Sequence, residues 1–277
     1  MLGEAISNLP LRLSLTPSQN RLRQMPIKLY GSQPSPPSHA ARLMLERKGL
    51  DFKMVWLLPG LWPALLRSRG FRGGTVPAMK INGRKLQQSR EISRALEELK
   101  PDPPLFPEDP QRRLAVEEAE RWGDEVLQDV PRRIVRWVSV HRPESRVMIA
   151  TEIGIPLPRF AAWINAPSAR HLARKVDSDG QIQRAIAQVP EVLDHVDTLI
   201  ADRVIGGDEP NAADFQIGTS VRALLTVQDL KPALEGRPAA DHAMRLLPEF
   251  GNEFPVGMLP AEWLTGLMRG RATARPD

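Results

Sequence analysis

The sequence predicts an α/β domain followed by an all-helical domain, and three local patterns lead to this division. Residues 74–89 read as a strand, an Asn82-Gly83 turn, a second strand and a helix start. Asn-Gly is the strongest short-range signal for a hairpin because both residues tolerate positive φ. Residues 101–110 hold five prolines, which indicates a semi-rigid linker, and from residue 111 onward the apolar spacing is helical.

The first domain is expected to occupy residues 26–100. Apolar residues at helical spacing across residues 38–48 predict its first helix, and Gly49 supplies a C-terminal stop. The expected elements are, in order, strand 27–30, helix 38–48, strand 51–57, helix 59–69, the hairpin and helix 89–99. This βαβαββα order is that of the thioredoxin fold, so we expect a thioredoxin-like domain here.

The linker leads into a second domain, which we expect to be all-helical over residues 111–255. Long helices are predicted from residue 111 past Leu127, over residues 182–204 with an interruption at Pro190, and over residues 212–226. The last of these is apolar on most faces, which indicates a central position. Asn211 and Asp214 are spaced to satisfy helix-start N–H groups reciprocally, and we interpret them as a folding element, not as a site.

Two terminal segments are expected to lie outside the domains. Residues 1–25 are predicted to be a disordered or weakly docked extension. They contain several arginines and only one acid, Glu4, so a targeting peptide is the alternative interpretation. Residues 256–277 form a tail, for which two alternatives stay open: it folds over the site between the domains, or its end is disordered.

Composition excludes several classes of function. The chain has no cysteine, which excludes disulfides, a catalytic thiolate and sulfur-ligated zinc. Its five histidines show no metal-ligand spacing, so no metal is expected. No apolar run reaches about 18 residues, and the basic residues behind the +5 charge are interleaved with acids and lack stacking aromatics. We therefore predict a cytoplasmic protein with no membrane or nucleic-acid partner.

Several motifs occur in the order found in cytosolic glutathione transferases: Val76-Pro77 before the hairpin, Gln88-Ser89 at a helix start, the proline-rich linker and the Asn211-x-x-Asp214 cap. Over about residues 26–250 the chain therefore resembles that family. The loop that begins at Ser35 lies where serine-type and zeta-like members keep a catalytic hydroxyl and omega-like members keep a cysteine. The chain is therefore similar to a bacterial member of the serine-type, zeta-like or omega-like kind, and it contains no cysteine.

The resemblance implies that glutathione is the co-substrate and assigns parts of it to residues of this chain. It implies a cis peptide bond between Val76 and Pro77, with the Val76 backbone pairing with the cysteinyl part of glutathione. It further implies that Gln88 and Ser89 bind the γ-glutamyl group. We expect these four residues to form the glutathione site together with Ser38.

Ser35 is the catalytic candidate. Ser35 and Ser38 fall on the two cysteine positions of a thioredoxin Cys-x-x-Cys motif, so thiol–disulfide exchange through them is excluded. A serine hydroxyl can instead donate a hydrogen bond to the glutathione thiolate, which lowers the pKa of the thiol. Helix capping is the alternative interpretation for both serines. The thiolate would then attack a hydrophobic electrophile.

The electrophile is expected to bind between the two domains, where apolar ligand sites are common. Trp122 and Arg121 are the candidates from the second domain, whereas Trp56 and Trp62 are interpreted as core residues. The resemblance also implies a two-fold homodimer. Opposite charges on two predicted helices could serve its interface: Arg90 and Arg94 on one, and Glu117, Glu118 and Glu120 on the other.

Two functions other than that of a glutathione transferase stay open. The first is a non-enzymatic protein of the same fold that binds an apolar ligand or a protein partner. It is considered because the Ser35 loop is rich in proline and no basic residue is assigned to the glycine carboxylate of glutathione. The second is a zeta-like isomerase of maleyl-type acids, although Pro36-Pro37 replaces the Ser-Cys pair typical of that group.

Overall fold

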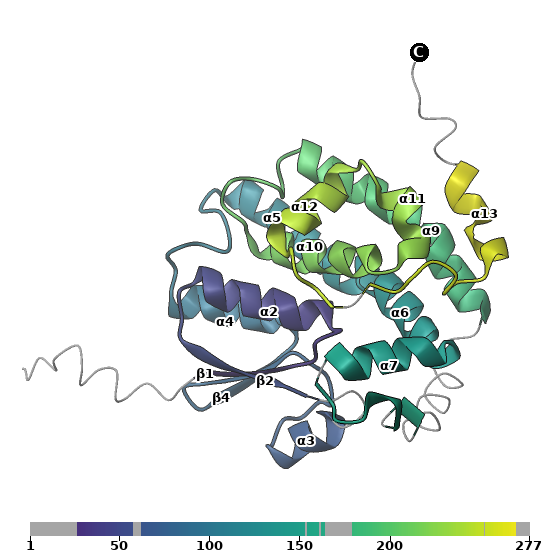
Figure 1. Ribbon diagram of the computed structural model, residues 1–277. Coiled ribbons are helices and arrows are strands. Elements are labelled where there is room, and N and C mark those ends of the chain that lie inside the picture. The colour runs from purple at the N-terminus through teal and green to yellow at the C-terminus, as the bar shows by residue number, and fades with distance from the viewer. Residues whose placement is uncertain are drawn as a thin grey trace, which may run out of the picture.

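In the computed structural model, the residues described are 27–57, 62–152, 154–160, 162–163, 179–251 and 253–269. They form a sheet domain and a helical domain (Figure 1). The predicted extension, residues 1–25, lies outside the described residues, and so does the end of the predicted tail. The predicted fold class, a thioredoxin-like domain followed by an all-helical domain, is confirmed.

The sheet has four strands in the order β2-β1-β3-β4. They are β1 (Ile27–Gly31), β2 (Phe52–Trp56), β3 (Ala78–Ile81) and β4 (Arg84–Gln87). β1 and β2 are parallel, whereas β3 pairs antiparallel with both β1 and β4. Asn82 and Gly83 join β3 to β4 with φ angles of 46° and 81°, so the predicted Asn-Gly turn is confirmed.

Three helices accompany the sheet: α2 (Pro36–Arg47), α3 (Trp62–Ser68) and α4 (Ser89–Leu99). Figure 1 shows α2 and α4 on the sheet face turned toward the helical domain, and α3 on the other side. α2 begins at Pro36, before the predicted start. Proline is tolerated in the first helical turn because the N–H that it lacks would have no intrahelical partner there.

The helical domain contains α5 (Pro110–Trp122), the π-helical turn η1 (Gly123–Leu127), α6 (Asp129–His141), α7 (Pro143–Glu152), α9 (Asp179–Ala201), α10 (Ala212–Leu225), η2 (Gln228–Leu230), α11 (Lys231–Leu234), α12 (Pro238–Leu246) and α13 (Ala261–Arg269). α9 continues through Pro190, so the predicted interruption is wrong. α5 begins at Pro110, the last proline of the predicted linker and one residue before the predicted start of the helical domain.

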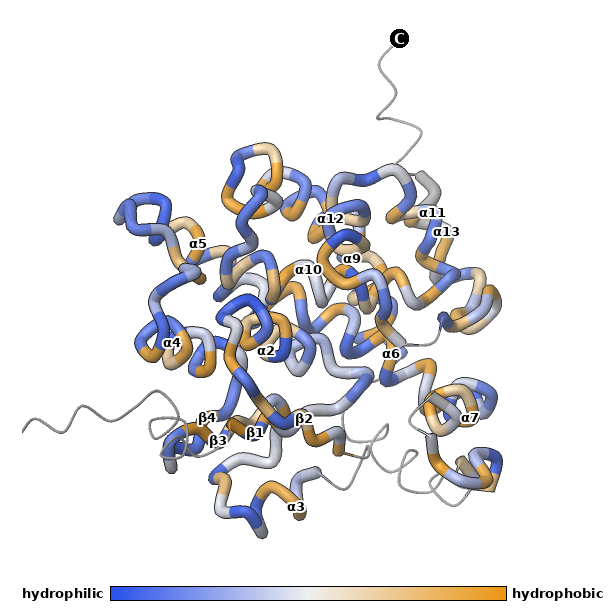
Figure 2. The backbone as a smooth tube through the Cα atoms, turned by 60° about the vertical axis from the view of Figure 1, so that its left-hand side comes forward, coloured by the Kyte–Doolittle hydropathy of each residue, from blue (hydrophilic) through white to orange (hydrophobic). Residues whose placement is uncertain are grey.

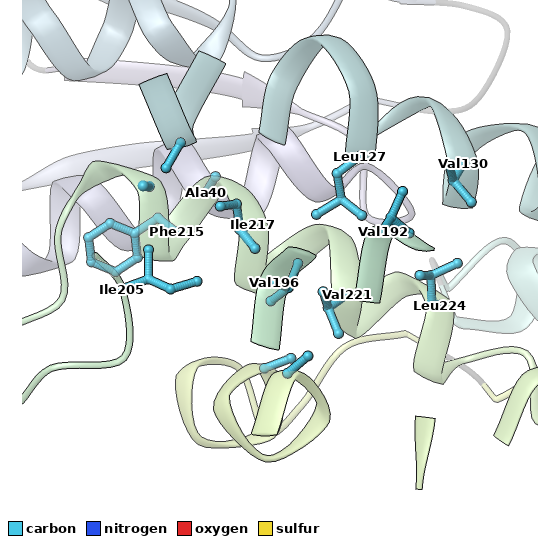
Figure 3. Close-up of a cluster of buried hydrophobic side chains, with 14 of the residues drawn as sticks. Ala40, Leu127, Val130, Val192, Val196, Ile205, Phe215, Ile217, Val221 and Leu224 are labelled. Atoms are coloured by element: carbon cyan, nitrogen blue, oxygen red, sulfur yellow. The ribbon is translucent and has the colours of Figure 1, made fainter. Parts of the chain in front are cut away.

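α10 is the central helix, as its apolar sequence predicts. Its side chains are buried from Ala212 to Leu224, and it packs against α2, α5 and α12. Figure 3 shows Phe215 and Ile217 of α10 beside Val196 of α9 in this core. Figure 2 shows hydrophobic segments of the strands and of α10 in the interior. Both domains therefore share one core, which fixes α2 relative to the helices.

The predicted cap of α10 is confirmed. The Asn211 side chain accepts hydrogen bonds from the N–H groups of Ala213 (2.9 Å) and Asp214 (3.2 Å). The Asp214 carboxylate accepts in return from the Asn211 N–H at 2.8 Å. This reciprocal pairing satisfies orphan donors at the helix start and is a structural element.

The described part of the tail docks on the helical domain. The Asp229 carboxylate accepts hydrogen bonds from the N–H groups of Gly257 (2.7 Å) and Leu259 (2.8 Å). The Trp263 ring of α13 then packs on Trp137 of α6, with centroids 5.0 Å apart. Figure 1 shows α13 on the side of the helical domain away from the sheet, so this part of the tail does not fold over the sheet domain.

Candidate functional site

Three segments of the predicted site meet at one end of the sheet. Tyr30 of β1 lies opposite Ala78 of β3, and Ala78 lies opposite Gln87 of β4. The end of β1, the start of β3 and the end of β4 are therefore side by side. The serine loop, the Val-Pro pair and the Gln-Ser pair continue directly from these three strand ends. The structure thus brings the predicted segments together.

The Ser35 hydroxyl is held by a second serine. Ser35 is the N-cap residue of α2, but its side chain makes no capping hydrogen bond. The Ser32 N–H donates to Ser38 Oγ (3.2 Å), and Ser38 Oγ donates to Ser35 Oγ (3.0 Å). Because Ser35 accepts in this chain of bonds, its own proton stays available for a ligand. Neither serine hydroxyl therefore accepts a capping hydrogen bond from the first turn of α2, although Ser35 is its N-cap residue.

Ser38 has a supporting position, which corrects its assignment to the ligand-contacting set. Its side chain is fully buried, so it reaches a ligand only through Ser35. Gly31 makes this packing possible, since a Cβ there would lie 2.9 Å from Ser38 Cβ and 2.5 Å from Met54 Cε. The close approach of α2 to β1 therefore depends on glycine at this position.

The first turn of α2 offers a ligand no free backbone donor. Pro36 and Pro37 have no N–H group. The N–H groups of Ser38 and His39 both donate to the Ser35 carbonyl, at 3.0 and 3.3 Å. The Ser35 hydroxyl is consequently the donor that this helix start presents. The consecutive prolines Pro36 and Pro37 are the sequence signal that indicates this lack of free backbone donors.

The Val76-Pro77 bond is cis, as predicted. Within the described parts of the chain, the Val76 N–H and C=O have no hydrogen-bond partner. The preceding loop is fixed by Gln87, whose side chain accepts from the Gly73 N–H (2.7 Å) and donates to the carbonyls of Gly73 (3.2 Å) and Thr75 (3.3 Å). The site therefore presents an ordered backbone edge that can pair with a peptide ligand. Gln87 was missed by sequence reasoning because its partners lie outside any local motif.

Gln88 has an unusual backbone conformation, with φ 74° and ψ 142°. A non-glycine residue rarely adopts such a positive φ, and strain of this kind tends to occur at functional sites. Its side chain is exposed at the N-terminus of α4, where the helix dipole favours an anion. Its placement agrees with the predicted contact to a γ-glutamyl carboxylate.

The Ser89 side chain points elsewhere than predicted. It is 1% exposed, and its hydroxyl donates to Gln216 Oε1 of α10 at 2.7 Å. Gln216 Nε2 in turn donates to Gln128 Oε1 at 2.8 Å. The hydroxyl is thus used between the domains, and the remaining donor that Ser89 can offer a ligand is its backbone N–H at the start of α4. The reason is packing against a helix 127 positions away, which no local pattern reveals.

Comparison with known proteins identifies the sheet domain. Residues 29–104 match the family model described as glutathione S-transferase, N-terminal domain. This segment is therefore similar to a glutathione S-transferase N-terminal domain. The resemblance found in the sequence is confirmed.

Solved structures extend the comparison to the whole fold. A glutathione transferase from Populus trichocarpa is 18% identical, with 90% of this chain and 100% of that chain covered and a TM-score of 0.56. A β-etherase from Sphingobium is 19% identical, with 91% and 96% covered and a TM-score of 0.53. A maleylacetoacetate isomerase from Anaeromyxobacter dehalogenans is 20% identical, with 91% and 93% covered and a TM-score of 0.51. The chain therefore has the glutathione transferase fold over both domains.

The structure does not bring Trp122 and Arg121, the predicted electrophile residues, to the sheet end where the other predicted site residues meet. The Trp122 ring packs inside the helical domain on His195 of α9, with centroids 4.3 Å apart. Arg121 is exposed and lies 3.8 Å from Glu125 of the following turn η1. Trp122 therefore points toward α9 and Arg121 toward solvent. A single sequence does not reveal these orientations.

The two other tryptophans differ from each other. Trp62 packs on the cluster beneath the sheet, so its interpretation as a core residue is confirmed. Trp56 is 38% exposed at the end of β2, so the same interpretation is wrong for it. The Trp56 ring lies 5.3 Å from the ring of His39, which follows the serine loop.

His39 fixes the loop that carries Ser35. Its Nε2 donates to the Gln33 carbonyl at 2.7 Å, and its ring packs on Trp56 and, at 4.8 Å, on Phe250. Burial lowers the pKa of His39 to about 4, and the nearby charge of Arg42 acts in the same direction. His39 is therefore a neutral positioning residue at physiological pH. Sequence reasoning missed it because a lone histidine has no local signature.

The charges proposed for a dimer interface are largely paired within the chain. Arg94 lies 2.5 Å from Glu120, and Ser93 donates to the same carboxylate at 2.7 Å. Burial raises the pKa of Glu120, against the opposing effect of Arg94. Arg90 lies 2.8 Å from Glu125. Arg90, Arg94 and Glu120 are therefore paired within one chain, and the dimer stays a prediction that these three charges do not support.

Two kinds of feature are absent from the residues that the structure describes. No helix in these ranges is long and apolar enough to cross a membrane. No group of three His, Cys, Asp or Glu residues among them could hold a metal ion.

Proposed function

We propose that this protein binds glutathione, or a closely related thiol, and transfers its sulfur to a hydrophobic electrophile. One observation carries the proposal: the Ser35 hydroxyl, with its proton left free by Ser38, lies at the same sheet end as the open Val76 backbone and the start of α4. These are the groups that a tripeptide thiol needs for its sulfur, its backbone and its anionic end.

In this proposal each group has a defined role. The Val76 N–H and C=O pair with the cysteinyl backbone of glutathione. Gln88 and the N–H groups at the start of α4 hold the γ-glutamyl carboxylate. The thiol loses its proton to solvent, and Ser35 Oγ–H donates a hydrogen bond to the thiolate, which favours the charged form. The sulfur then forms a bond to the electrophilic carbon and its leaving group departs.

A second candidate function is binding without turnover, and the Pro36-Pro37 pair favours it. With no backbone N–H free at the start of α2, a thiolate would receive a hydrogen bond from Ser35 alone. Weak stabilisation of the thiolate would leave a bound thiol protonated at neutral pH. The homodimer and the cytoplasmic location are further proposals that rest on the family resemblance.

Titration calorimetry with glutathione, combined with ultraviolet absorbance of the bound thiolate over a pH series, separates these functions. Binding with a lowered thiol pKa and conjugation of an aryl halide would support the transferase. Binding with an ordinary thiol pKa and no conjugation would support the second candidate. Absence of thiol binding would overturn both.

A further inference from the structure

An apolar cluster lies on the outside of the helical domain, in the stretch that follows α7. Leu157, Phe160 and Trp163 are 73%, 57% and 72% exposed, and residues 158–160 and 162–163 are helical. Figure 1 shows this stretch at the edge of the molecule, next to α7. The other exposed large apolar side chains of the described residues are scattered along the chain, which is ordinary for a protein surface. Three of them within seven residues form a patch that needs an explanation.

The helical turn that carries the cluster exposes its large side chains and buries a small one. Ala162 is 7% exposed, so its methyl group faces the protein. Phe160 and Trp163 are three positions apart and share a face of the turn, where their rings stack with centroids 6.0 Å apart. A helix that only packs on its own domain would turn the aromatic rings inward. The rings are therefore available for a contact outside the chain.

Positive charge accompanies the cluster. Arg159 is exposed next to Phe160 and forms no ion pair within the described ranges. The sequence from residue 153 to residue 176 has no acidic residue and contains four basic ones: Arg159, Arg170, Arg174 and Lys175. The interleaving of basic and acidic residues that is typical of this chain is thus interrupted here. A partner that meets this stretch should therefore be anionic.

The small size of the cluster favours a lipid surface over a protein partner. A stable protein–protein interface takes about 20–30 residues from each side. A segment that lies at a lipid surface instead inserts a few large apolar side chains and keeps its basic residues among the head groups. Tryptophan is enriched at this depth because its ring has an apolar body and a polar N–H. Three apolar side chains beside an unpaired arginine match this second arrangement.

We propose that Leu157, Phe160 and Trp163, together with Arg159, attach the protein to the surface of a membrane that contains anionic lipids. The three apolar side chains would enter the boundary between head groups and acyl chains, and Arg159 would face the lipid phosphates. The prediction of no membrane partner was based on the lack of a spanning run, and that criterion does not test contact with a surface. The proposal goes beyond the thiol chemistry and does not depend on it.

Flotation of the full chain with lipid vesicles tests the class of partner. Vesicles of phosphatidylcholine with about 30% phosphatidylglycerol should bind the protein, and vesicles of phosphatidylcholine alone should bind it at least about tenfold more weakly. Added salt should weaken binding to the anionic vesicles, because it screens the attraction between the basic residues and the lipid phosphates.

Matched variants locate the contact. The double change Phe160→Ser and Trp163→Ser should weaken binding to the anionic vesicles at least about tenfold, because it removes two large apolar side chains from the boundary. The double change Leu114→Ser and Val256→Ser is the control, since these apolar side chains are also exposed but lie outside the cluster. It should leave vesicle binding unchanged.

Charge and insertion are measured separately. Arg159→Gln should weaken binding about fivefold, as expected for one basic residue at a lipid surface, whereas Arg184→Gln, on the exposed surface of α9, should not. Lipids brominated on their acyl chains should quench part of the tryptophan fluorescence of the bound wild type. Trp163→Phe should still bind, because it keeps an aromatic ring, but should lose this quenching.

Four results would overturn the proposal: no binding of the wild type to anionic vesicles, equal binding to both kinds of vesicle, unchanged binding of a folded Phe160→Ser, Trp163→Ser variant, or no quenching of the bound wild type. Sedimentation velocity tests a second copy as the occupant, since self-association that the double variant abolishes, without vesicle binding, would assign the cluster to a contact between copies. Thermal unfolding establishes that each variant is folded. Failure of the thiol-binding experiments would leave this test unaffected.

Discussion

The two ends of α2 differ in how completely their buried polar groups are satisfied. At the N-terminal end, next to the proposed thiol site, three buried atoms have no hydrogen-bond partner among the described residues: Ser32 Oγ, Gln33 Oε1 and His39 Nδ1. At the C-terminal end, next to the linker, the Lys48 side chain is fully buried, yet its ammonium has a partner for each proton.

The partners of Lys48 come from α4 and the linker. Its Nζ donates to the Glu97 carboxylate and to the carbonyls of Pro101 (3.1 Å) and Pro103 (2.7 Å). Glu97 also accepts from the Leu105 N–H at 2.9 Å. One buried cation thus fixes the segment that joins the domains.

This difference distinguishes a fully paired part of the chain from the part where we propose that a ligand binds. Buried polar groups in proteins are nearly always paired, so the incomplete end is where a ligand or a water molecule can complete the pairing. The C-terminal end of α2, where the Lys48 ammonium is fully paired, has no such capacity. The strained backbone of Gln88 lies on the same side of the domain as the N-terminal end of α2.

Removal of the Lys48 ammonium should give the largest loss of stability. Lys48→Met keeps most of the side-chain volume but leaves the partly buried Glu97 carboxylate and two carbonyls without their donor. Breaking a buried pair in this way costs roughly 3–5 kcal/mol of unfolding free energy. Urea denaturation measures it, with the exposed Lys53→Met as control at about 0.5 kcal/mol or less. A loss below about 1 kcal/mol would contradict the structural role of this end.

His39 should make stability depend on pH. Its pKa is about 4 in the folded chain and 6.5 in the unfolded chain, so the unfolded state binds more protons between these values. Stability should therefore fall as the pH decreases from 6.5 to 4, by about 1.4 kcal/mol per pH unit and about 3 kcal/mol in total.

Urea denaturation across that pH range, with wild type and His39→Phe, isolates the contribution of this histidine. The variant keeps an aromatic ring against Trp56 and Phe250 but cannot take up a proton. It should lose less stability than wild type on acidification, whereas His141→Phe, at an exposed histidine, should behave as wild type does. Identical pH profiles for wild type and His39→Phe would refute the prediction.

Ser35→Ala should impair chemistry while leaving the fold intact. Loss of a hydrogen bond to a charged group costs about 1.5–3 kcal/mol, which corresponds to a roughly tenfold to hundredfold lower kcat. The affinity for glutathione should change little, because the tripeptide backbone is held by Val76 and α4. Steady-state conjugation of an aryl halide gives kcat and KM, and Ser35→Thr, which keeps the hydroxyl, should retain most of the turnover. Unchanged kcat in Ser35→Ala would exclude the catalytic role.

Local rules were sufficient for the features whose partners are close in sequence. The Asn82-Gly83 turn, the proline linker and the Asn211 cap all depend on residues within a few positions of each other. The cis Val76-Pro77 bond was predicted from the same kind of pattern together with the family resemblance. These features establish the fold and the position of three site segments.

The remaining details depend on contacts between distant segments. Trp122 could have faced either domain, and only the packing of α5 against α9 decides which. Ser38 and Ser89 have the expected positions in the chain, but their side chains are buried against other elements. Sequence reasoning therefore found the site and misjudged which of its side chains can touch a ligand.

The smallest expected effect concerns Ser89, whose hydroxyl we assign to the domain interface. Ser89→Ala and Gln216→Leu should each lower the unfolding free energy by about 1–2 kcal/mol, because each leaves a buried polar group without its partner. The double variant should lose less than the sum, with a coupling energy of about 1 kcal/mol between the two positions. Urea denaturation of the four proteins gives this cycle. Ser139→Ala, whose hydroxyl bonds within α6, should instead be additive with Gln216→Leu.

The same variants distinguish a structural serine from a ligand-binding one. If only the backbone N–H of Ser89 meets the thiol, Ser89→Ala should weaken glutathione binding by less than about threefold while it lowers stability. If the side chain turns from Gln216 to the ligand on binding, the affinity should fall tenfold or more, as expected for a lost hydrogen bond to a carboxylate. Calorimetry of both single variants decides between them, since Gln216→Leu would then free the hydroxyl and leave affinity unchanged or raise it. The second outcome would show that the ligand-binding region includes the start of α4 as well as the N-terminal end of α2, where buried polar atoms lack partners.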